Sequence, residues 1–554
     1  MTYYGDEAFP ALSDEQWARL QAYGSAQEVE SGALLSGVGE ATHDLILVDS
    51  GEAVVVRAAT ARAAEAVVAR FGTGQFAGEL GLLTGQATYL SARVSKPGQV
   101  RRISPVCFRQ LMDEDPDLSD VILRALMARR RNLRGGEAAR SIEILGSEMS
   151  AGALALRTYA ARQQLPHTWV EIDTPAGAAL ARAVAAAGGD LPVVITPTAV
   201  LRHATPARLA GQLGLSYQPV AGPLLDLVIV GAGPAGLAAA VYGASEGLRT
   251  LLLDAVAAGG QAAASSRIEN YLGFTSGISG AELTGRAAVQ AQKFGARIAS
   301  PSQAARLDTT HERLRITLTD DTTIEARAVV IATGARYRSL PLDRWAEFEG
   351  AGIYFAATEL EARACGPDPV GVVGGANSAG QAALYLAGRG NAVTLIVRGN
   401  DLAAGMSSYL ADRILAHAGI TVRTATEVTA LHGGGHLEAI TVHPAAPGDD
   451  RSGSNQPCRG LFCFIGATPA TGWLEDIAVD DDGFVLTGTQ LDGASPGATW
   501  AELGRRPLPF ETSQPLVFAV GDVRSGSMKR VAAAVGDGAS AIRSVHTALG
   551  SAGS

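Results

Sequence analysis

The chain has 554 residues, of which 47% are hydrophobic and 18% charged, and its formal net charge is −10. This length exceeds one compact core, so three or four domains of ~150 residues each are expected. The apolar content excludes a disordered chain, and the acidic balance offers no basic face to a polyanion, so no nucleic-acid partner is expected.

The N-terminal sequence has neither a basic flank nor an apolar stretch of signal-peptide type, and no later run reaches ~18 apolar residues. A cytoplasmic protein without a membrane contact is therefore expected. The four cysteines, Cys107, Cys365, Cys458 and Cys463, include no CxxC pair. This spacing argues against a Cys-rich metal centre, and no metal site is predicted.

Residues 1–135 form the first predicted domain. A helix is expected over Leu12–Ala22, followed by alternating strands with glycine-marked turns, such as DLILVDSGEAVVV, and by a basic helical tail, LMARRRNLRGG. This alternation predicts an antiparallel β-barrel or sandwich. Residues 136–217 then read as a small α/β domain, with strands at IEIL, TWVEID and PVVIT and helices at ALALRTYAARQQ and PARLAGQLGL.

The segment LVIVGAGPAG is an apolar strand that runs into a GxGxxG turn, with Gly231, Gly233 and Gly236, and then into an Ala-rich helix. Glycines at this spacing allow a tight turn, a close approach of the backbone to a pyrophosphate, and close packing of helix on strand. The next strand ends at Asp254, where a carboxylate accepts a hydrogen bond from a ribose hydroxyl. Together these features predict a dinucleotide site.

A second strand-to-helix turn, VGVVGGANSAG, covers residues 370–380, and the strand VTLIVR follows it. Its middle fingerprint position is Ala376, which places one methyl group where a pyrophosphate would approach. No acid stands at the strand end, and Arg398 is the one arginine there. This pattern favours NADPH as the nucleotide, with NADH as the alternative.

Further motifs follow in order: GGQ (259–261), IENYLGF (268–274), IATG (331–334) and VFAVGDV (517–523) before KRVAAAVGDG. With the two turns, they resemble the low-molecular-weight thioredoxin reductases over residues 222–554. The resemblance implies two Rossmann-like domains: an FAD domain of residues 222–342 and 466–554, interrupted by an NAD(P)H domain of residues 343–465.

The resemblance also implies which residues contact each cofactor. Those for FAD are Gly231, Gly233, Pro234, Ala235, Gly236, Asp254, Gly260, Gln261, Asn270, Thr333, Gly334, Gly521, Asp522, Arg530, Val531 and Ala532. Those for NAD(P)H are Gly374, Gly375, Asn377, Ser378, Ala379, Arg398 and Gly466. In the family the position of Asp522 holds the ribityl chain. The helix that opens at Arg530 would stabilise negative charge at the flavin N1 edge with its backbone N–H groups.

The family's redox cysteines have no counterpart in this chain. The matching segment is Tyr354–Glu359, and Phe355 and Thr358 stand at the two cysteine positions. A relay from flavin to disulfide needs a thiolate and a second thiol, so no catalytic residue is assigned. Phe355 is expected either to stack near the flavin ring or to pack in the core, and the residues alone leave both open. The nearest cysteine, Cys365, is expected to be a buried apolar residue.

The first domain resembles the cyclic-nucleotide-binding β-roll of catabolite-activator-type regulators at Asp44–Gly51 and Gly74–Gly85. The resemblance implies that Gly78 and Glu79 meet the cyclic phosphate and ribose, but Thr88 stands where the phosphate-binding arginine is expected. Losing that partner costs about 1.5–3 kcal/mol. A degenerate pocket in a sensor or interaction module is therefore favoured over a true cyclic-nucleotide site, and Arg93 would serve only after remodelling of the loop.

The second domain resembles a glutaredoxin or thioredoxin fold, with Leu191 and Pro192 at the position of that fold's cis-proline. The loop after its first strand, GSEMSAG, contains no cysteine, so its expected role is spacing, dimer contact or partner docking. The expected fold class is thus multidomain α/β: a β-roll, a thioredoxin-like domain and two Rossmann-like domains.

The favoured function is that of an FAD-dependent NAD(P)H oxidoreductase, in which hydride passes from NADPH to the flavin and then to an unidentified acceptor such as a redox protein. A homodimer is expected. One alternative is a thioredoxin-disulfide reductase that uses displaced cysteines, and another is a cyclic-nucleotide-responsive signalling flavoprotein. No helix-turn-helix pattern follows the β-roll, which disfavours a DNA-binding regulator.

Overall fold

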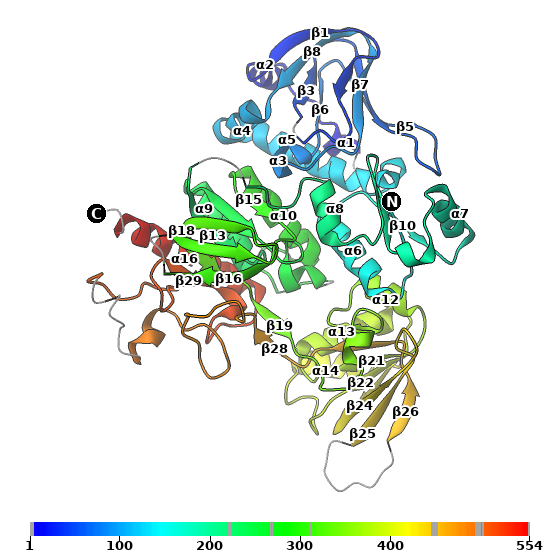
Figure 1. Cartoon of the computed structure of the whole chain (residues 1–554), viewed down its shortest axis with the longest axis vertical. Coiled ribbons are helices and arrows are strands. Elements are labelled where there is room, and N and C mark those ends of the chain that lie inside the picture. The colour runs from blue at the N-terminus through cyan, green and yellow to red at the C-terminus, as the bar shows by residue number, and fades with distance from the viewer. Residues whose placement is uncertain are drawn as a thin grey trace.

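A computed structural model describes residues 5–41, 43–219, 223–265, 267–268, 270–310, 313–444, 453–493, 500 and 503–551. The chain folds into four bodies (Figure 1): a β-roll, a small α/β body, a body with the largest sheet, and a body inserted into it. The confirmed fold class is multidomain α/β with mixed sheets. Within the described residues, no helix combines the length and apolar character needed to cross a membrane.

The β-roll consists of two four-stranded antiparallel sheets that enclose a hydrophobic core. The first has the order β1 (Ser25–Val29), β8 (Gly98–Ile103), β3 (Leu45–Val48), β6 (Gln75–Ala77). The second has the order β2 (Leu34–Ser36), β7 (Ser91–Lys96), β4 (Glu52–Arg57), β5 (Ala66–Gly72). The predicted antiparallel sandwich is therefore present.

Five helices accompany the β-roll: α1 (Gly5–Ala8), α2 (Asp14–Gln21), α3 (Gly81–Thr84), α4 (Pro105–Glu114) and α5 (Pro116–Leu133). Helix α2 is the predicted opening helix. It begins at Asp14 because Ser13 and Gln16 form a reciprocal capping box. Helix α5 carries the predicted basic tail, and Leu118, Ile122 and Leu126 on its inner face are buried against the β-roll.

The small α/β body has a four-stranded sheet of order β10 (Thr168–Glu171), β9 (Glu143–Gly146), β11 (Val193–Ile195), β12 (Val200–Leu201). Its helices are α6 (Ala151–Arg162), α7 (Pro175–Ala183) and α8 (Pro206–Gln212). The sequence patterns did not predict α7 or β12. The peptide bond between Leu191 and Pro192 is cis. This topology is compatible with a thioredoxin-type domain, which stays a prediction.

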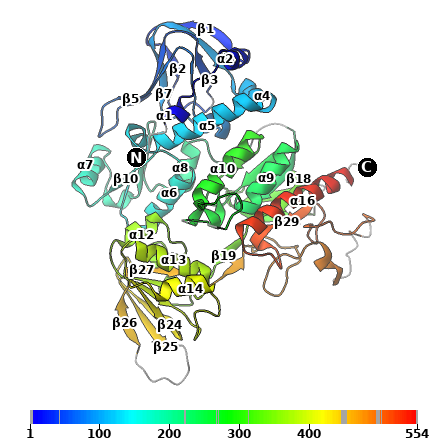
Figure 2. The same ribbon diagram turned by 180° about the vertical axis from the view of Figure 1, so that it is seen from behind.

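The largest sheet has parallel strands β15 (Arg297–Ala299), β14 (Thr250–Leu253), β13 (Leu225–Val230), β18 (Thr323–Ile331) and β29 (Val517–Ala519). Strands β17 (Leu314–Leu318) and β16 (Ala304–Asp308) extend it in antiparallel fashion. Three helices pack nearby: α9 (Pro234–Ser245), α10 (Gly280–Lys293) and the C-terminal α16 (Val531–Ser551). Figure 2 shows α9 and α16 side by side.

The inserted body has a parallel sheet of order β20 (Ile353–Tyr354), β27 (Gly460–Cys463), β21 (Val370–Val373), β22 (Val393–Ile396), β23 (Ile420–Arg423). An antiparallel sheet of β24 (Thr426–His432), β25 (Ala439–Pro444) and β26 (Ser454–Pro457) adjoins it. The helices are α11 (Trp345–Phe348), α12 (Glu359–Cys365), α13 (Asn377–Gly388) and α14 (Ser408–Leu415).

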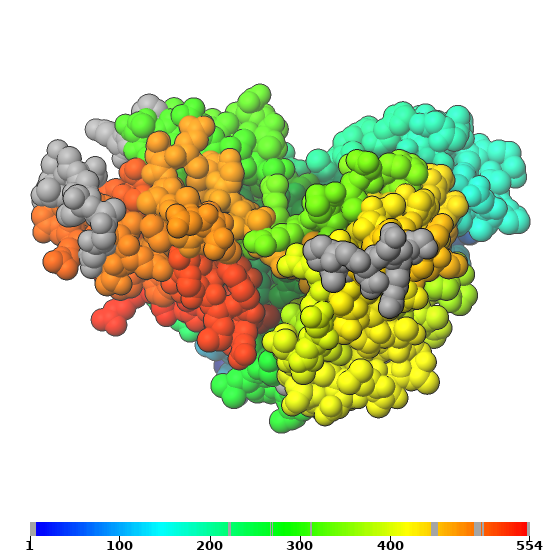
Figure 3. All heavy atoms as spheres, turned by 90° about the horizontal axis from the view of Figure 1, so that it is seen from below, coloured from blue at the N-terminus to red at the C-terminus, as the bar shows by residue number. Residues whose placement is uncertain are grey.

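Two short antiparallel strands, β19 (Ala335–Tyr337) and β28 (Ala467–Pro469), join the inserted body to the body with the largest sheet (Figure 1). From below, these two bodies appear as two adjacent masses, the inserted one in yellow (Figure 3). The predicted domain boundaries at 342/343 and 465/466 lie next to these two strands. That the segments between the predicted boundaries are separate domains stays a prediction.

The small α/β body touches all three others. Its Tyr159 hydroxyl donates to the Ser300 carbonyl at 3.1 Å, in the body with the largest sheet. The Leu213 carbonyl accepts from the Ala87 amide of the β-roll at 2.9 Å. Leu154 packs against the core of the inserted body. The two N-terminal bodies therefore pack against the rest of the chain instead of being joined to it only by a linker.

Candidate functional site

The turn between β13 and α9 is shaped by two glycines that have no room for a side chain. A Cβ on Gly231, whose φ is +108°, would lie 2.3 Å from the Ala332 carbonyl oxygen. A Cβ on Gly236 would lie 1.8 Å from the Gly231 carbonyl oxygen. The strand, the helix and the β18 loop thus approach so closely that only glycine fits at either position.

Gly233 plays a different part, because a Cβ there would come no nearer than 4.0 Å to another atom, the Gly260 Cα. Helix α9 begins directly afterwards with Pro234 at its first position. The amides of Ala235 and Gly236 in this first turn have no acceptor within the helix. The open backbone next to a helix N-terminus fits a pyrophosphate, so these residues suit the nucleotide that the sequence predicts.

Asp254 follows β14 and is held by the backbone. Its carboxylate accepts from the amide of Ala232 at 2.8 Å and from those of Val256 and Ala257 at 2.9 Å each. Burial raises the pKa of Asp254, and the hydrogen bonds oppose this. Because a carboxylate has about four acceptor positions, one remains for a ribose hydroxyl. That contact stays a prediction.

The GGQ and ATG motifs meet beside this turn. The Gln261 side chain donates to the Ala335 carbonyl, and the Thr333 hydroxyl donates to the Ala470 carbonyl at 2.9 Å. Gly334 has a φ of +65° and accepts from the Ala470 amide at 3.0 Å. Asn270 is exposed, and its neighbour Glu269 lies outside the described residues. These contacts attach the GGQ motif to β19, the strand that leads into the inserted body.

Asp522 lies in a short 3-10 helix, Gly521–Val523, ahead of α16. Burial raises its pKa, and Lys529 opposes the increase. Helix α16 begins at Val531, so the amides of Val531 and Ala532 fall in its first turn, as predicted. A Cβ on Gly538 would lie 2.1 Å from the Ala235 carbonyl, which explains how α16 packs directly on α9. Flavin contacts at Asp522, Arg530, Val531 and Ala532 stay predictions.

The turn between β21 and α13 repeats the geometry of the first. Gly374 has a φ of +138°, and a Cβ on it would lie 2.4 Å from the Phe464 carbonyl oxygen. Ala376 is the N-cap residue of α13. Gly375 is confined, because its Cβ would lie 3.1 Å from Val397. The second turn therefore also suits a nucleotide. Ala376 adds one methyl group at the position that Gly233 leaves open in the first turn.

The other predicted NAD(P)H residues spread around this turn. The Asn377 side chain accepts from the Ser407 amide at 2.8 Å, so its oxygen is already used within the protein. Ala379 is fully buried against the core, and Ser378 is exposed in the first turn of α13. Arg398 is exposed after β22, and Gly466, with a φ of +95°, precedes β28. Arg398 is thus the residue of this set that offers a cation to solvent.

Phe355 packs in an aromatic cluster. Its ring stacks on that of Tyr337 with centroids 5.6 Å apart and an interplanar angle of 3°, and the Trp345 ring lies 6.2 Å away. Burial raises the pKa of Tyr337 to about 12. Of the two expectations for Phe355, core packing is therefore observed, and it couples the inserted body to strand β19. Flavin stacking by Phe355 stays a prediction.

Thr358 precedes α12. Its amide and hydroxyl both donate to Glu361 Oε2, the amide at 3.0 Å. Glu361 lies in the first turn of the helix, so the pair stabilises the start of α12. The position of the family's second cysteine thus carries a structural contact.

Three of the four cysteines are buried in the inserted body, and all four are free thiols. Burial raises the pKa of Cys365 and of Cys458 to about 12, and it raises that of Cys463 further. At neutral pH these groups are thiols rather than thiolates, and the thiolate is the form that attacks a disulfide. The buried cysteines are therefore poor nucleophiles at neutral pH.

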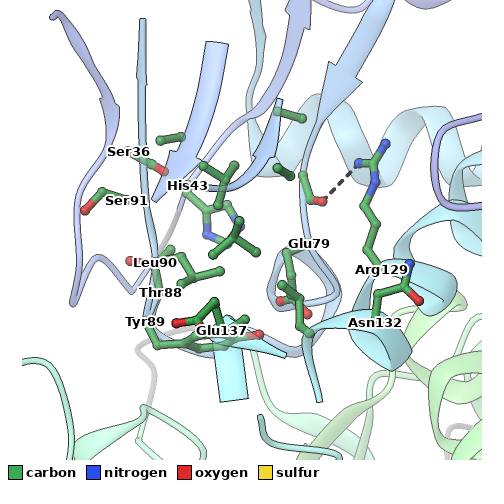
Figure 4. Close-up of a pocket in the computed structure, with 18 of the residues that line it drawn as sticks. Ser36, His43, Glu79, Thr88, Tyr89, Leu90, Ser91, Arg129, Asn132 and Glu137 are labelled. Carbon is green, nitrogen blue, oxygen red and sulfur yellow. Dashed lines mark hydrogen bonds between the residues drawn. The ribbon is translucent and has the colours of Figure 1, made fainter. Parts of the chain in front are cut away.

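The three residues of the predicted degenerate pocket line one cavity of about 690 Å³ in the β-roll (Figure 4). Glu79 accepts from Arg130 of α5 in a bidentate ion pair and from the Gly81 amide at 2.7 Å. The Thr88 hydroxyl donates to the Gly37 carbonyl. Sequence reasoning missed Arg130, because no local pattern links it to a residue 51 positions earlier.

Comparisons with known proteins agree with this geometry. Residues 225–538, more than half of the chain, match the family described as "Pyridine nucleotide-disulphide oxidoreductase". Residues 26–115 match the cyclic nucleotide-binding domain family. The predicted relationships of the C-terminal bodies and of the β-roll are both confirmed.

Thioredoxin reductase from Treponema pallidum is 33% identical over 319 residues, which are 57% of this chain and 94% of the relative. Thioredoxin reductase from Bacillus subtilis is 30% identical over 58% of this chain and 94% of the relative. Among solved structures, T. acidophilum thioredoxin reductase matches with a TM-score of 0.50 and 29% identity, over 58% of this chain and 98% of that one.

The chain therefore belongs to the pyridine nucleotide-disulphide oxidoreductase family. It is an FAD-dependent NAD(P)H oxidoreductase related to thioredoxin reductases. The β-roll and the small α/β body, residues 5–219, precede the part that matches these relatives.

Proposed function

We propose that this chain oxidises NADPH through bound FAD and passes the electrons to an external acceptor without a dithiol of its own. Bound FAD would take up a hydride, that is two electrons and a proton, and release the electrons to the acceptor. The turn at Gly231–Gly236 would hold the pyrophosphate of FAD, and Asp254 its ribose. Asp522 and the first turn of α16 would bind the ribityl chain and the flavin N1 edge.

The observation that carries this proposal is the state of the thiols. Phe355 stacks on Tyr337, Thr358 contacts Glu361, and neither can form a disulfide. The three cysteines in the same body are buried, with pKa values raised by burial. A thioredoxin-disulfide reductase with displaced cysteines would need one of these thiols to ionise and to reach the flavin.

The preference for NADPH rests on Arg398. Its side chain is exposed just after β22, where the second ribose of a dinucleotide is expected, and no acid accompanies it. A guanidinium pairs well with a 2′-phosphate and has no partner in NADH. We further propose a redox protein as acceptor and a homodimer as the assembly, by analogy with the thioredoxin reductases.

The test is a variant with Cys107 replaced by serine and the three buried cysteines replaced by alanine. We expect its turnover of NADPH with ferricyanide to stay within about twofold of wild type, because no thiol lies on the electron path. With thioredoxin as acceptor, we expect the wild-type rate to be at least about a hundredfold lower than with ferricyanide, since no thiolate can attack or be regenerated.

The visible flavin spectrum serves as the folding control for this variant. Loss of ferricyanide turnover while FAD remains bound would show that a displaced cysteine carries the electrons. Rapid thioredoxin reduction by the wild type, abolished in the variant, would lead to the same conclusion. Single restorations of Cys107, Cys365, Cys458 and Cys463 would then identify the residue.

A further inference from the structure

The β-roll cavity has the size of a ligand site. Its volume of about 690 Å³ lies inside the range of roughly 300–1,000 Å³ that small-molecule sites occupy. Figure 4 shows Ser36, Thr88 and Ser91 along the strands on one side and Arg129 and Asn132 of α5 on the other. Leu165 and His167 from the small α/β body complete the wall, so the cavity spans two bodies.

The acidic side chains in the wall are paired with arginines. Arg130 occupies the Glu79 carboxylate, and the ion pair keeps the pKa of Glu79 low against the effect of burial. Arg102 pairs with Asp44 at 3.3 Å, and Arg57 pairs with Glu137 at 3.1 Å. Each acidic side chain of the wall therefore has an arginine partner within the protein.

Arg129, which also lines the cavity, is held in place by aromatic rings and backbone carbonyls. Its guanidinium lies 4.9 Å from the centroid of the Phe71 ring and 4.5 Å from that of Phe76. It donates to the carbonyls of Ala8 at 2.8 Å and Gly78 at 3.1 Å. Burial lowers its pKa to about 9, as expected for a cation held by rings and carbonyls.

A cyclic phosphate therefore finds no cation where the fold would place one. The Thr88 hydroxyl at that position donates to the Gly37 carbonyl and accepts from the Glu40 amide at 3.2 Å. Arg93 pairs with Glu65 at 2.5 Å and does not line the cavity. Among the described wall residues, Arg129 and Arg134 are the arginines without an ion pair, and Arg134 is exposed.

The rest of the wall is apolar or neutral. Ile46, Val55, Phe71, Leu90 and Leu133 contribute hydrocarbon surface. Burial lowers the pKa of His43, against the opposing effects of Glu79, Glu40 and Asp44, and it also lowers that of His167. Both imidazoles are therefore neutral at neutral pH. Such a surface gains free energy from burying rings or chains.

Gln86 and Tyr89 of the wall each carry a buried polar side-chain atom without a hydrogen-bond partner in the described structure. Gln86 and Tyr89 are 2% and 4% exposed, and in the described structure neither Gln86 Nε2 nor the Tyr89 hydroxyl has a partner. Unpaired buried donors are rare and costly, so each needs an explanation. An oxygen acceptor on a bound molecule would supply what both donors lack.

We propose that the β-roll cavity binds an uncharged, mainly apolar small molecule, of the size of two or three rings and bearing one oxygen acceptor, in place of a cyclic nucleotide. The molecule would contact both the β-roll and the small α/β body. This site is separate from the oxidoreductase centre and does not rest on the proposed reaction.

The test uses 2-naphthol as the probe, with calorimetry on the full chain saturated with FAD. The comparison compounds are cyclic AMP and 2-naphthoate, which has the same rings and a carboxylate. We expect 2-naphthol to bind at least about tenfold more tightly than either anion, because only the neutral compound avoids desolvating a charge. No binding of 2-naphthol, or tighter binding of cyclic AMP or 2-naphthoate, would overturn the proposal.

Two variants locate the binding. Ala69→Trp, on β5, places an indole into the cavity and should weaken 2-naphthol binding at least about tenfold, since the filled volume is lost to the ligand. Ala61→Trp, exposed in the loop between β4 and β5 and outside the wall, should change it less than about twofold. Equal effects would assign the binding to another place and contradict the proposal.

Hydrogen exchange on the wild-type chain gives a readout that needs no variant. With 2-naphthol present, we expect slower exchange at residues 86–92, 129–138 and 165–167, which come from both sides of the cavity. Protection confined to residues near the Gly231 or Gly374 turns would contradict the proposal even if Ala69→Trp fails to fold.

Discussion

The two strand–turn–helix units of the oxidoreductase part share one backbone solution and differ where a nucleotide would lie. In both, the first glycine has a positive φ, and its Cβ would lie 2.3 or 2.4 Å from a carbonyl oxygen of a neighbouring loop. The middle position is Gly233 in the first turn and Ala376 in the second. The first turn is therefore the more open to a pyrophosphate.

The two units also differ in the residue that follows the next strand. After β14, Asp254 is fixed by three backbone amides. After β22, Arg398 is exposed, and no acid stands at the end of that strand. A preorganised acceptor suits a nucleotide that stays bound, whereas an exposed cation suits one that exchanges. Under the proposed function, the first turn would hold the retained cofactor and the second the exchanging one, and a few side chains would make the difference.

The largest effect is expected for Gly236→Ala. The new Cβ would lie 1.8 Å from the Gly231 carbonyl, so the turn and α9 must separate. We expect a protein without bound FAD, measured as loss of flavin absorbance after purification. The matched control is Gly536→Ala on α16, where a Cβ meets no atom within 4 Å. A yellow Gly236→Ala protein would show that the first turn does not hold FAD.

Gly374→Ala should separate the two sites. The Cβ would lie 2.4 Å from the Phe464 carbonyl at a φ of +138°, so the second turn must shift. We expect FAD to remain bound and the rate of flavin reduction by NADPH to fall by about a hundredfold, as a misplacement of ~1 Å implies. Gly388→Ala, at the end of α13 with no atom near its Cβ, is the control. Loss of FAD instead would mean that the two bodies are not independent.

Arg398→Ala tests the nucleotide preference. Removing a charge-assisted contact to a 2′-phosphate should raise the KM for NADPH about tenfold and leave that for NADH unchanged, which corresponds to about 1.4 kcal/mol. Steady-state kinetics with both nucleotides measures this. Arg413→Ala, an exposed arginine of α14 in the same body, should change neither. Equal changes with NADPH and NADH would remove the phosphate role.

The smallest effect is expected for Ala376→Gly, which makes the second turn like the first. Ala376 is the N-cap of α13, and glycine is preferred to alanine there. With the methyl group removed, we expect the KM for NADPH to fall about twofold to threefold. A rise in KM would show that the methyl group packs usefully against the nucleotide.

Much of this architecture is readable from the sequence because it depends on local patterns. Gly231 and Gly374 follow apolar strands and precede Ala-rich segments, with Gly236 five residues after Gly231. The sequence also shows directly that positions 355 and 358 are Phe and Thr rather than cysteine. Helix α2, predicted over Leu12–Ala22, begins at Asp14, where Ser13 and Gln16 form the capping box. The periodicity of α7 was too short and Ala-rich to stand out, and β12 has only two residues.

The tertiary structure decided the contacts between distant residues. It pairs Glu79 with Arg130, directs the Thr88 hydroxyl to Gly37, and stacks Phe355 on Tyr337. It also makes one cavity from a β-roll and from Leu165 and His167 of the next body. Such partners are set by how the bodies pack, and packing depends on shape and burial across the chain rather than on any local spacing. The sequence by itself determined which groups are present, and the packing determined which of them remain free to act.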